Sequence, residues 1–173
     1  MNLTIKPFGP LDEMILEHLR QDLAGFGRVE IAPVTPLPRS VIHRKRHGRI
    51  QYLASEFERA CVEEPGDRVL AVTSVDLFER GLNFVFGHAM IHDRYAVISV
   101  ARFQDDGHGK LLERITKTAI HELGHTLGLY HDDKNPECVM HFSERLEDTD
   151  RKRRTFCGKC EPTAAFTLSR LGT

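Results

Sequence analysis

Three histidines and one glutamate stand close together in the chain, at spacings that favour metal-assisted chemistry. His121, Glu122 and His125 lie in a stretch with helical periodicity, and His131 follows shortly afterwards. Histidines at positions i and i+4 share one face of a helix and can bind one zinc ion. Glu122 points about a hundred degrees away from His121 around the helix, so it can reach a water beside the ion without binding the ion itself. Three neutral imidazoles leave a fourth coordination position open, which is typical of catalytic zinc and not of structural zinc.

Gly128 supports His131 as the third ligand. A glycine at this point permits the left-handed backbone that ends a helix, so the chain can turn and bring His131 back toward the other two imidazoles. Sites of the thermolysin type instead take a glutamate as third ligand, which here would be Glu144 or Glu147. The pairing of Gly128 with His131 favours the histidine.

The expected chemistry is hydrolysis at a polarised carbonyl group. Bound zinc lowers the pKa of a water molecule toward ~7 and polarises the carbonyl. Glu122 accepts the proton of that water and passes it to the leaving amine. The oxyanion needs a donor besides the zinc, and the sequence leaves that donor open, because the direction of the Tyr130 side chain does not follow from its position.

Three of the four cysteines, Cys138, Cys157 and Cys160, crowd into the last third of the chain. In an intracellular protein such a cluster favours metal binding over disulfide formation. A redox role for Cys157 and Cys160 is disfavoured, because redox pairs usually follow a strand and here a basic run precedes the pair. Nucleobase deaminases also combine histidine, glutamate and a cysteine pair on zinc, but one residue separates their histidine from their glutamate. Cys61 lies on the core face of a predicted helix, so we expect a buried and inert thiol.

Length and charge describe an ordinary globular chain. Its 173 residues suit one domain, and the formal net charge of −1 gives the whole molecule no electrostatic attraction to nucleic acid or an anionic membrane. Residues 1–10 lack the basic and apolar segments of a signal peptide, and no apolar run approaches the ~20 residues of a membrane span. We therefore expect a soluble, cytoplasmic monomer without nucleic-acid or membrane partners.

The chain is nearly neutral as a whole, but positive charge is concentrated in two basic runs, at residues 44–47 and 151–154. We interpret both runs as solvated loops. The alternative is that they bind acidic peptide side chains or a nucleic-acid backbone, although neither run carries the interleaved aromatic residues of a base-stacking surface.

Hydrophobic periodicity predicts an α+β fold, in which a mixed sheet packs against helices. Strands are predicted over residues 3–8, 29–32, 69–75, 83–91 and 95–103. Helices are predicted over residues 11–24, 51–62 and 110–128, and a short fourth helix is predicted within residues 157–171. Residues 39–50 have no clean periodicity and stay unassigned. Residues 105–109 are typical of a loop, and residues 129–154 of irregular chain.

The strands at 83–91 and 95–103 are predicted to form an antiparallel hairpin, because only a short polar connection separates them. The strand at 83–91 is the expected sheet edge for an extended peptide. His88, His92 and His108 are expected at the surface or at the rim of the cleft.

The stretch from His121 to His131 resembles the metzincin clan of zinc peptidases, because Met140 follows it closely. The resemblance implies a mixed five-stranded sheet with two helices, a smaller C-terminal part, and a cleft between them. It also implies that Met140 lies in a turn beneath the metal. Its thioether is expected to pack there without binding the ion.

The sequences Cys138-Val139-Met140 and Cys157-Gly158-Lys159-Cys160 narrow the resemblance to the archaemetzincins. Residues 73–77 and 83–87 also look like theirs. This resemblance implies a second, structural zinc. It further implies a single metzincin-like catalytic domain over residues 1–173, with an N-terminal part at 1–131 and a C-terminal part at 132–173 that holds the structural zinc and a helix.

One departure concerns the second zinc. Archaemetzincins usually have a cysteine directly after the third histidine, where this chain has Asp132. A carboxylate oxygen can bind zinc, so Asp132 is the positional candidate for the fourth ligand beside Cys138, Cys157 and Cys160. Asp133 and His141 are its competitors, and Cys61 is a more remote one.

These observations predict a zinc metallopeptidase that acts on a peptide or protein and holds two zinc ions, one catalytic and one structural. The alternative function is that of a zinc-containing protein that binds a peptide or another partner with little or no cleavage. The sequence leaves open the substrate, the choice between endo- and exopeptidase activity, and the oxyanion donor.

Overall fold

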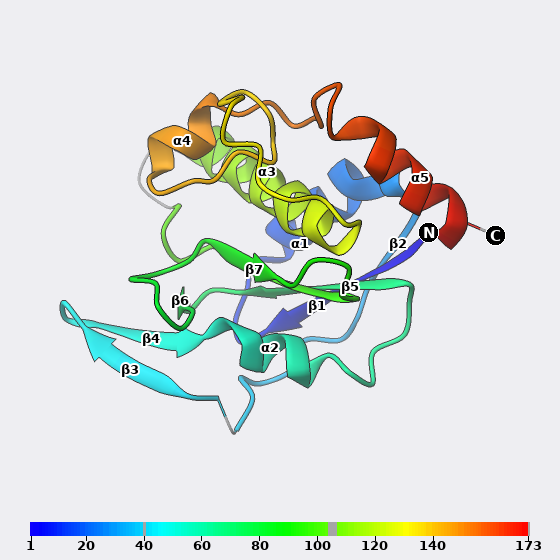
Figure 1. The fold of residues 1–173 in the computed structure, drawn as a ribbon. Helices are drawn as coiled ribbons and strands as arrows, with labels where there is room; N and C mark the ends of the chain where they lie inside the picture. The colour runs from blue at the N-terminus through cyan, green and yellow to red at the C-terminus, as the bar shows by residue number, and fades with distance from the viewer. Residues whose placement is uncertain (40, 104–106, 173) are drawn as a thin grey trace.

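The computed structural model describes residues 1–39, 41–103 and 107–172, and a five-stranded sheet lies at its centre (Figure 1). The strands follow the order β2-β1-β5-β8-β7. Their bounds are β1 (Asn2–Phe8), β2 (Arg28–Ile31), β5 (Arg68–Thr73), β7 (Gly87–Ala89) and β8 (Tyr95–Ser99). The first four in that order run parallel, and β7 pairs antiparallel with β8 at the edge. The predicted mixed sheet and hairpin are confirmed.

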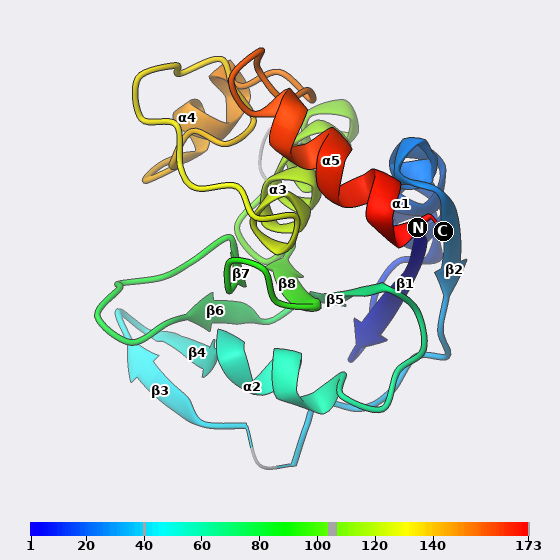
Figure 2. The same cartoon turned by 45° about the vertical axis from the view of Figure 1, so that its right-hand side comes forward.

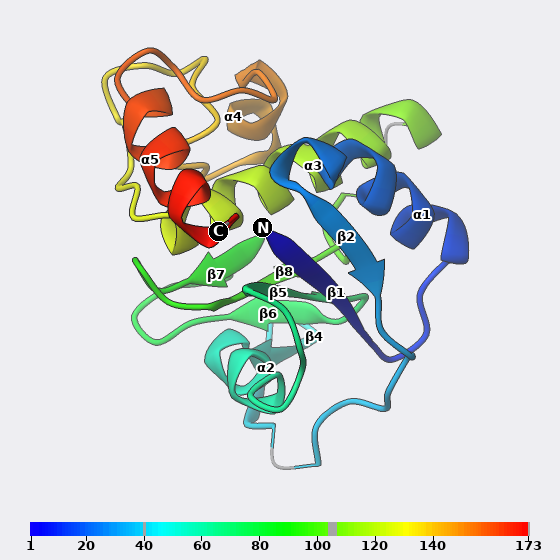
Figure 3. The same ribbon diagram turned by 90° about the vertical axis from the view of Figure 1, so that its right-hand side faces the viewer.

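Helices cover both faces of this sheet (Figures 1 and 3). Helices α1 (Glu13–Asp22) and α3 (His108–Thr126) lie on one face, and α2 (Ala54–Ala60) lies on the other. Central strand β5 alternates between the two cores, because Leu70 and Val72 join the larger apolar cluster and Val69 and Ala71 join the smaller one. This double burial explains why the whole strand is apolar.

A second, three-stranded sheet begins in residues 39–50, the region that the sequence left unassigned, and extends beyond it. It consists of β3 (His43–Arg46), β4 (Arg49–Leu53) and β6 (Asp76–Phe78), in the order β3-β4-β6. The prediction of a helix over 51–62 was wrong at its start, because Gln51 and Leu53 pair with β6 and are buried there. The helix begins only at Ala54.

Other predicted elements differ in length. The strand predicted at 83–91 is regular only over β7, since Val85 turns away and bridges Leu77 of β6. The strand predicted at 95–103 ends at Ser99. A short 3-10 helix, η1 (Leu23–Phe26), extends α1. The predicted loop at 105–109 lies partly outside the described residues.

The C-terminal segment is mainly irregular, as predicted, and lies on the side of α3 away from the sheet (Figure 2). It also contains a short helix that the sequence did not suggest, α4 (Leu146–Arg151), before α5 (Glu161–Leu171). Among the helices that the structure describes, none combines the length and apolar character that a membrane span requires.

The two basic runs are only partly solvated. In the first, the Arg44 guanidinium lies 3.9 Å from the centre of the Phe78 ring and donates to backbone oxygens of the 82–83 segment. In the second, Lys152 is buried, and Arg154 forms ion pairs with Asp22 and Glu113. The interpretation as solvated loops was therefore wrong for these three side chains, whereas the other residues of both runs are exposed.

Candidate metal centres

Helix α3 brings the three histidines of the motif together. The nitrogen donors of His121, His125 and His131 all lie within 4.8 Å of one another. His121 and His125 are one turn apart and buried on the helix. Gly128 has φ +95° just after the helix end, so the chain reverses there and returns His131 to the other two. The predicted left-handed stop is observed.

Backbone oxygens fix the orientation of two of these imidazoles. His121 Nδ1 lies 2.7 Å from the oxygen of Val139, and His125 Nδ1 lies 2.8 Å from that of Leu129. A proton on Nδ1 satisfies each oxygen and leaves the Nε2 lone pair free to bind a metal. Burial lowers the pKa of all three histidines, that of His125 to about 4. The rings are therefore held neutral, as metal ligation requires.

The spacing of the imidazole nitrogens fits zinc. His125 Nε2 and His131 Nε2 are 3.2 Å apart. Two nitrogens at zinc–nitrogen distances of 2.0–2.1 Å in a tetrahedral site lie about 3.3 Å apart. The described residues that join this donor cluster are the three histidines alone, and neither Glu144 nor Glu147 is among them.

Glu122 faces the cleft beside this cluster. Burial raises the pKa of its carboxyl group to about 8, while the charges of His88 and Lys152 act in the opposite sense. A cation held by the neighbouring histidines would oppose this effect of burial and favour the carboxylate form that accepts a proton. Gly87 of β7 packs directly against it, because a Cβ atom at that position would lie 2.6 Å from Glu122 Cγ and Oε1.

Met140 lies beneath the histidine cluster. Its side chain is fully buried, and a Cβ atom on Gly124 would collide with its Sδ. Gly124 stands between His121 and His125 on α3, so the thioether packs under the turn that carries two donors. The position matches the role in packing that the sequence predicted for Met140.

A second donor cluster forms where the C-terminal segment folds back on itself. Asp132, Cys138, Cys157 and Cys160 place one donor atom each within 4.8 Å of one another. Cys138 Sγ and Cys160 Sγ are 3.9 Å apart, and Cys157 Sγ is 3.3 Å from Asp132 Oδ2. Two sulfurs bound to a tetrahedral zinc at 2.3 Å lie about 3.8 Å apart. This donor set therefore also fits zinc.

The competing ligands lie outside this second cluster. Asp133 is exposed, and His141 Nδ1 instead lies 3.2 Å from the backbone oxygen of Asp132. Cys61 belongs to the smaller apolar core, where burial raises the pKa of its thiol to about 12. Of the residues considered as fourth ligand, Asp132 alone is within reach of the three thiols in the described chain.

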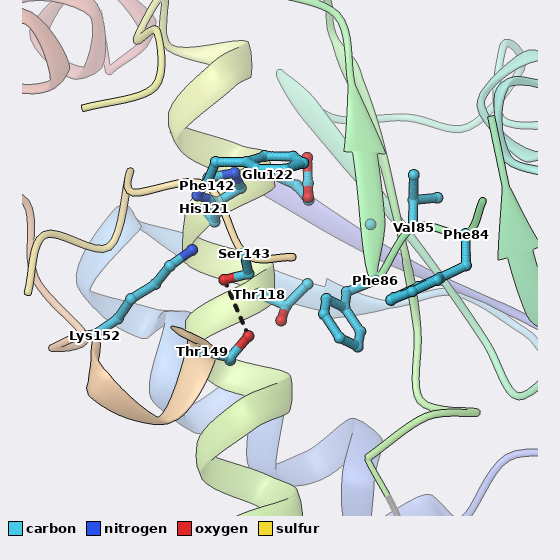
Figure 4. Close-up of a pocket in the computed structure, with 11 residues that line it drawn as sticks. Phe84, Val85, Phe86, Thr118, His121, Glu122, Phe142, Ser143, Thr149 and Lys152 are labelled. Carbon is cyan, nitrogen blue, oxygen red and sulfur yellow. Dashed lines mark hydrogen bonds between the residues drawn. The ribbon is translucent and has the colours of Figure 1, made fainter. Parts of the chain in front are cut away.

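The cleft in front of the histidine cluster is bounded by β7 on one side. Its lining includes His88, Tyr130 and all three histidines of the cluster. His88 Nδ1 lies 2.7 Å from Glu58 Oε1 of α2. A neighbouring pocket lies deeper, between Phe86, Thr118, Glu122 and Lys152 (Figure 4). His88 therefore faces the cleft, as expected for one of the rim histidines.

Comparison with known proteins decides the family. The sequence model of peptidase family M54 matches residues 39–164. An archaemetzincin of Methanopyrus kandleri is 50% identical over 107 residues, which cover 61% of this chain and 60% of that relative. An archaemetzincin of Methanocaldococcus jannaschii is 36% identical over 167 residues, which cover 92% of this chain and 90% of that relative. The chain belongs to peptidase family M54.

The family comparison extends to the fold. A crystal structure of the archaemetzincin from Methanopyrus kandleri has a TM-score of 0.85 at 36% identity, and the match covers 98% of this chain and 96% of that one. Membership of M54 makes this chain a zinc metallopeptidase, a hydrolase, and confirms the resemblance on which the sequence analysis relied.

Sequence reasoning missed three residues of the site. Gly87 and Gly124 matter because a side chain there would collide with Glu122 or Met140. A glycine inside a strand or helix signals such close approach, so both carried a readable signal. Lys152 carried none, because its basic run is typical of an exposed loop and its burial is set by the tertiary fold.

Proposed function

We propose that this M54 peptidase hydrolyses peptide bonds at a zinc ion held by His121, His125 and His131, with Glu122 as general base. The observation that carries the proposal is the convergence of three neutral imidazoles beside a buried carboxyl group at the wall of a cleft. Three protein donors leave one vertex of a tetrahedral zinc free, which is the arrangement of catalytic sites.

The groups at the cleft have different roles in the proposed reaction. Zinc, when bound, supplies a Lewis acid that polarises the carbonyl and lowers the pKa of water. The Glu122 carboxylate accepts a proton from the attacking water and returns it to the amide nitrogen that leaves. The backbone oxygens of Val139 and Leu129 hold His121 and His125 in the tautomer that this arrangement needs.

The peptide substrate is proposed to lie along β7. This strand is the last in the five-stranded sheet. Within the described residues it pairs with β8 on one side only, so its other side offers free backbone groups. An extended peptide can pair with such an edge. Gly87 of β7 touches Glu122, which places the edge next to the proposed base.

We propose a second, structural zinc at Asp132, Cys138, Cys157 and Cys160. Four protein donors close the coordination sphere and exclude a reacting water. The larger apolar core includes Leu127 as well as Met140 and Ala164, so residues 1–131 and 132–173 are proposed to form one catalytic domain that this zinc stabilises. A monomeric state, a cytoplasmic location and the absence of nucleic-acid partners remain predictions from the sequence.

A peptide digest tests the proposed activity. Zinc-replete protein is incubated with a diverse peptide mixture, and new termini are identified by mass spectrometry. We expect cleavage that stops on chelation and returns when zinc is restored. Measurable peptide binding without new termini would instead support the alternative function of a zinc-containing binding protein.

A further inference from the structure

Lys152 is a buried cation that the proposed reaction does not use. Lys152 directly follows α4 in the chain and is only 5% exposed. No hydrogen bond or ion pair joins its ammonium group to a residue within the described ranges. Its neighbours differ, since Arg153 pairs with Glu137 and Arg154 pairs with two carboxylates. Buried charges in proteins are normally paired, so an unpaired one points to a ligand.

The Lys152 side chain lines the deeper pocket beside Glu122 and His121. The cavity itself is small, with about 50 Å³ of space, and it opens to solvent. Figure 4 shows Lys152 extending from the C-terminal segment toward the side of the pocket where His121 and Ser143 lie. The ammonium group therefore faces a space that is continuous with the proposed place of bond cleavage.

The rest of the pocket wall divides into an apolar side and a polar side. Phe84, Phe86 and Phe142 contribute aromatic surface. Thr118, Thr149 and Ser143 contribute hydroxyl groups, and the last two are joined at 3.1 Å. Such a pocket fits a ligand with an apolar stem and a negatively charged end, because the stem packs on the rings and the charged end meets the lysine.

A nearby arginine does not compete for that ligand. The Arg102 guanidinium lies over the Phe84 ring, but it is already paired with Asp76 through contacts of 2.6 and 2.7 Å. Burial lowers the pKa of Lys152 to about 8, although the charges of Glu122 and Asp148 favour its ammonium form. Burial removes water that would stabilise the charged ammonium group, and an anionic ligand would stabilise that group in place of the water.

We propose that Lys152 binds a carboxylate of the peptide substrate next to the scissile bond. This inference rests on the proposed function and names its substrate class. The carboxylate has two sources in a peptide, an aspartate or glutamate side chain and the free C-terminus. The first source implies selective cleavage beside acidic residues, and the second implies release of short C-terminal fragments.

Binding measurements test the inference without requiring turnover. The probes are N-acetylated pentapeptides that differ only in Glu or Gln at one position and carry an amidated C-terminus. A second set has neutral side chains and differs only in a free or amidated C-terminus. Dissociation constants are measured by calorimetry on zinc-loaded Glu122→Gln protein, and cleavage of the same peptides is measured separately on wild-type protein.

We expect the carboxylate form to bind at least about 10-fold more tightly in one of the two sets, as for a charge-assisted hydrogen bond. Lys152→Met in the same background should abolish that preference, Lys152→Arg should keep part of it, and Lys152→Glu should reverse it toward the neutral peptide. Lys45→Met is the matched control, because Lys45 is exposed on β3. Zinc content and circular dichroism confirm that each variant is folded.

Equal affinity for the carboxylate and neutral peptides in both sets would overturn the inference, and so would binding of neither. A preference that persists in Lys152→Met would also overturn it. If Lys152 acted only by favouring the ionised form of Glu122, its loss would slow the cleavage of all peptides equally. Carboxylate-dependent binding without cleavage would support the inference and count against the proposed peptidase activity, so the two failures are distinguishable.

Discussion

The two donor clusters share the segment from His131 to Val139, yet they differ in what surrounds them. His131 turns to one cluster and Asp132, the next residue, turns to the other. Val139 fixes His121 through its backbone oxygen, whereas Cys138 belongs to the thiol cluster. The imidazoles meet a cleft and a buried carboxyl group, while the thiols and Asp132 supply four donors among themselves. The histidine cluster has three protein donors and opens to a cleft, as a catalytic metal site requires. The second cluster has four protein donors, as a structural metal site requires.

Glu122→Gln removes the proposed base beside the histidine cluster and should have the largest effect, a loss of peptide turnover. Loss of a general base costs roughly 10²- to 10⁴-fold in rate, whereas the three histidines and the bound zinc should remain. Peptide turnover and zinc content are measured on the same preparation. Glu13→Gln is the matched control, since Glu13 is exposed on α1. Wild-type turnover in Glu122→Gln would show that another group is the base.

Cys160→Ala removes a donor from the second cluster and should lower the stability of the protein. Loss of a bound metal is among the substitutions that cost more than about 4 kcal/mol, so the melting temperature should fall by roughly 10 °C. Elemental analysis should find one zinc per chain instead of two. Cys61→Ala is the control for thiol loss, because Cys61 lies in the smaller apolar core. Retention of both ions in Cys160→Ala would mean that other residues hold the second zinc.

Gly87→Ala should sharpen the comparison by displacing the base without removing it. The added methyl group would lie 2.6 Å from Glu122 and 2.8 Å from the backbone oxygen of Val97, so the carboxylate must shift. A displacement of about 1 Å can cost about 10² in rate, and we expect a fall in kcat with the zinc content unchanged. Gly25→Ala meets no atom within 4 Å and serves as control. Unchanged kcat in Gly87→Ala would show that Glu122 tolerates the displacement.

Asp150→Asn tests how α4 is attached to α3 independently of zinc. Hydrogen bonds of 2.7 Å from Arg114 lower the pKa of the Asp150 carboxyl group below its ordinary value of 3.8. A lowered pKa stabilises the folded state above the ordinary value, and that contribution is lost as the pH falls through 3.8 and then through the lower folded value. The effect of Asp150→Asn on the free energy of unfolding should therefore be full near pH 7, about 1–3 kcal/mol, and should shrink steadily as the pH falls below 3.8.

Denaturation of both proteins across pH measures this difference. Glu147→Gln is the control, because Glu147 is exposed on the same helix. A difference between wild type and Asp150→Asn that is constant from pH 7 to pH 2 would contradict the assigned ion pair.

Local patterns predicted most of the fold and its histidine cluster. Helix α3 and the stop at Gly128 follow from periodicity and backbone preference, which neighbouring residues determine. The hairpin of β3 and β4 did not follow, because its residues are mostly exposed and show no alternation. The roles of Gly87 and Lys152 arise from contacts with segments distant in sequence, namely Glu122 and the pocket wall. Such contacts leave little trace in the order of residues.

Diffraction at the zinc absorption edge from crystals of zinc-replete protein tests the central claim most directly. The predicted result is two anomalous peaks per chain. One lies about 2.0–2.1 Å from an imidazole nitrogen of His121, His125 and His131, with its fourth vertex open to solvent in the cleft. The other is enclosed by three sulfurs and an Asp132 oxygen. A side chain of the protein filling the fourth vertex of the first ion, or no peak between the three imidazoles, would contradict the account.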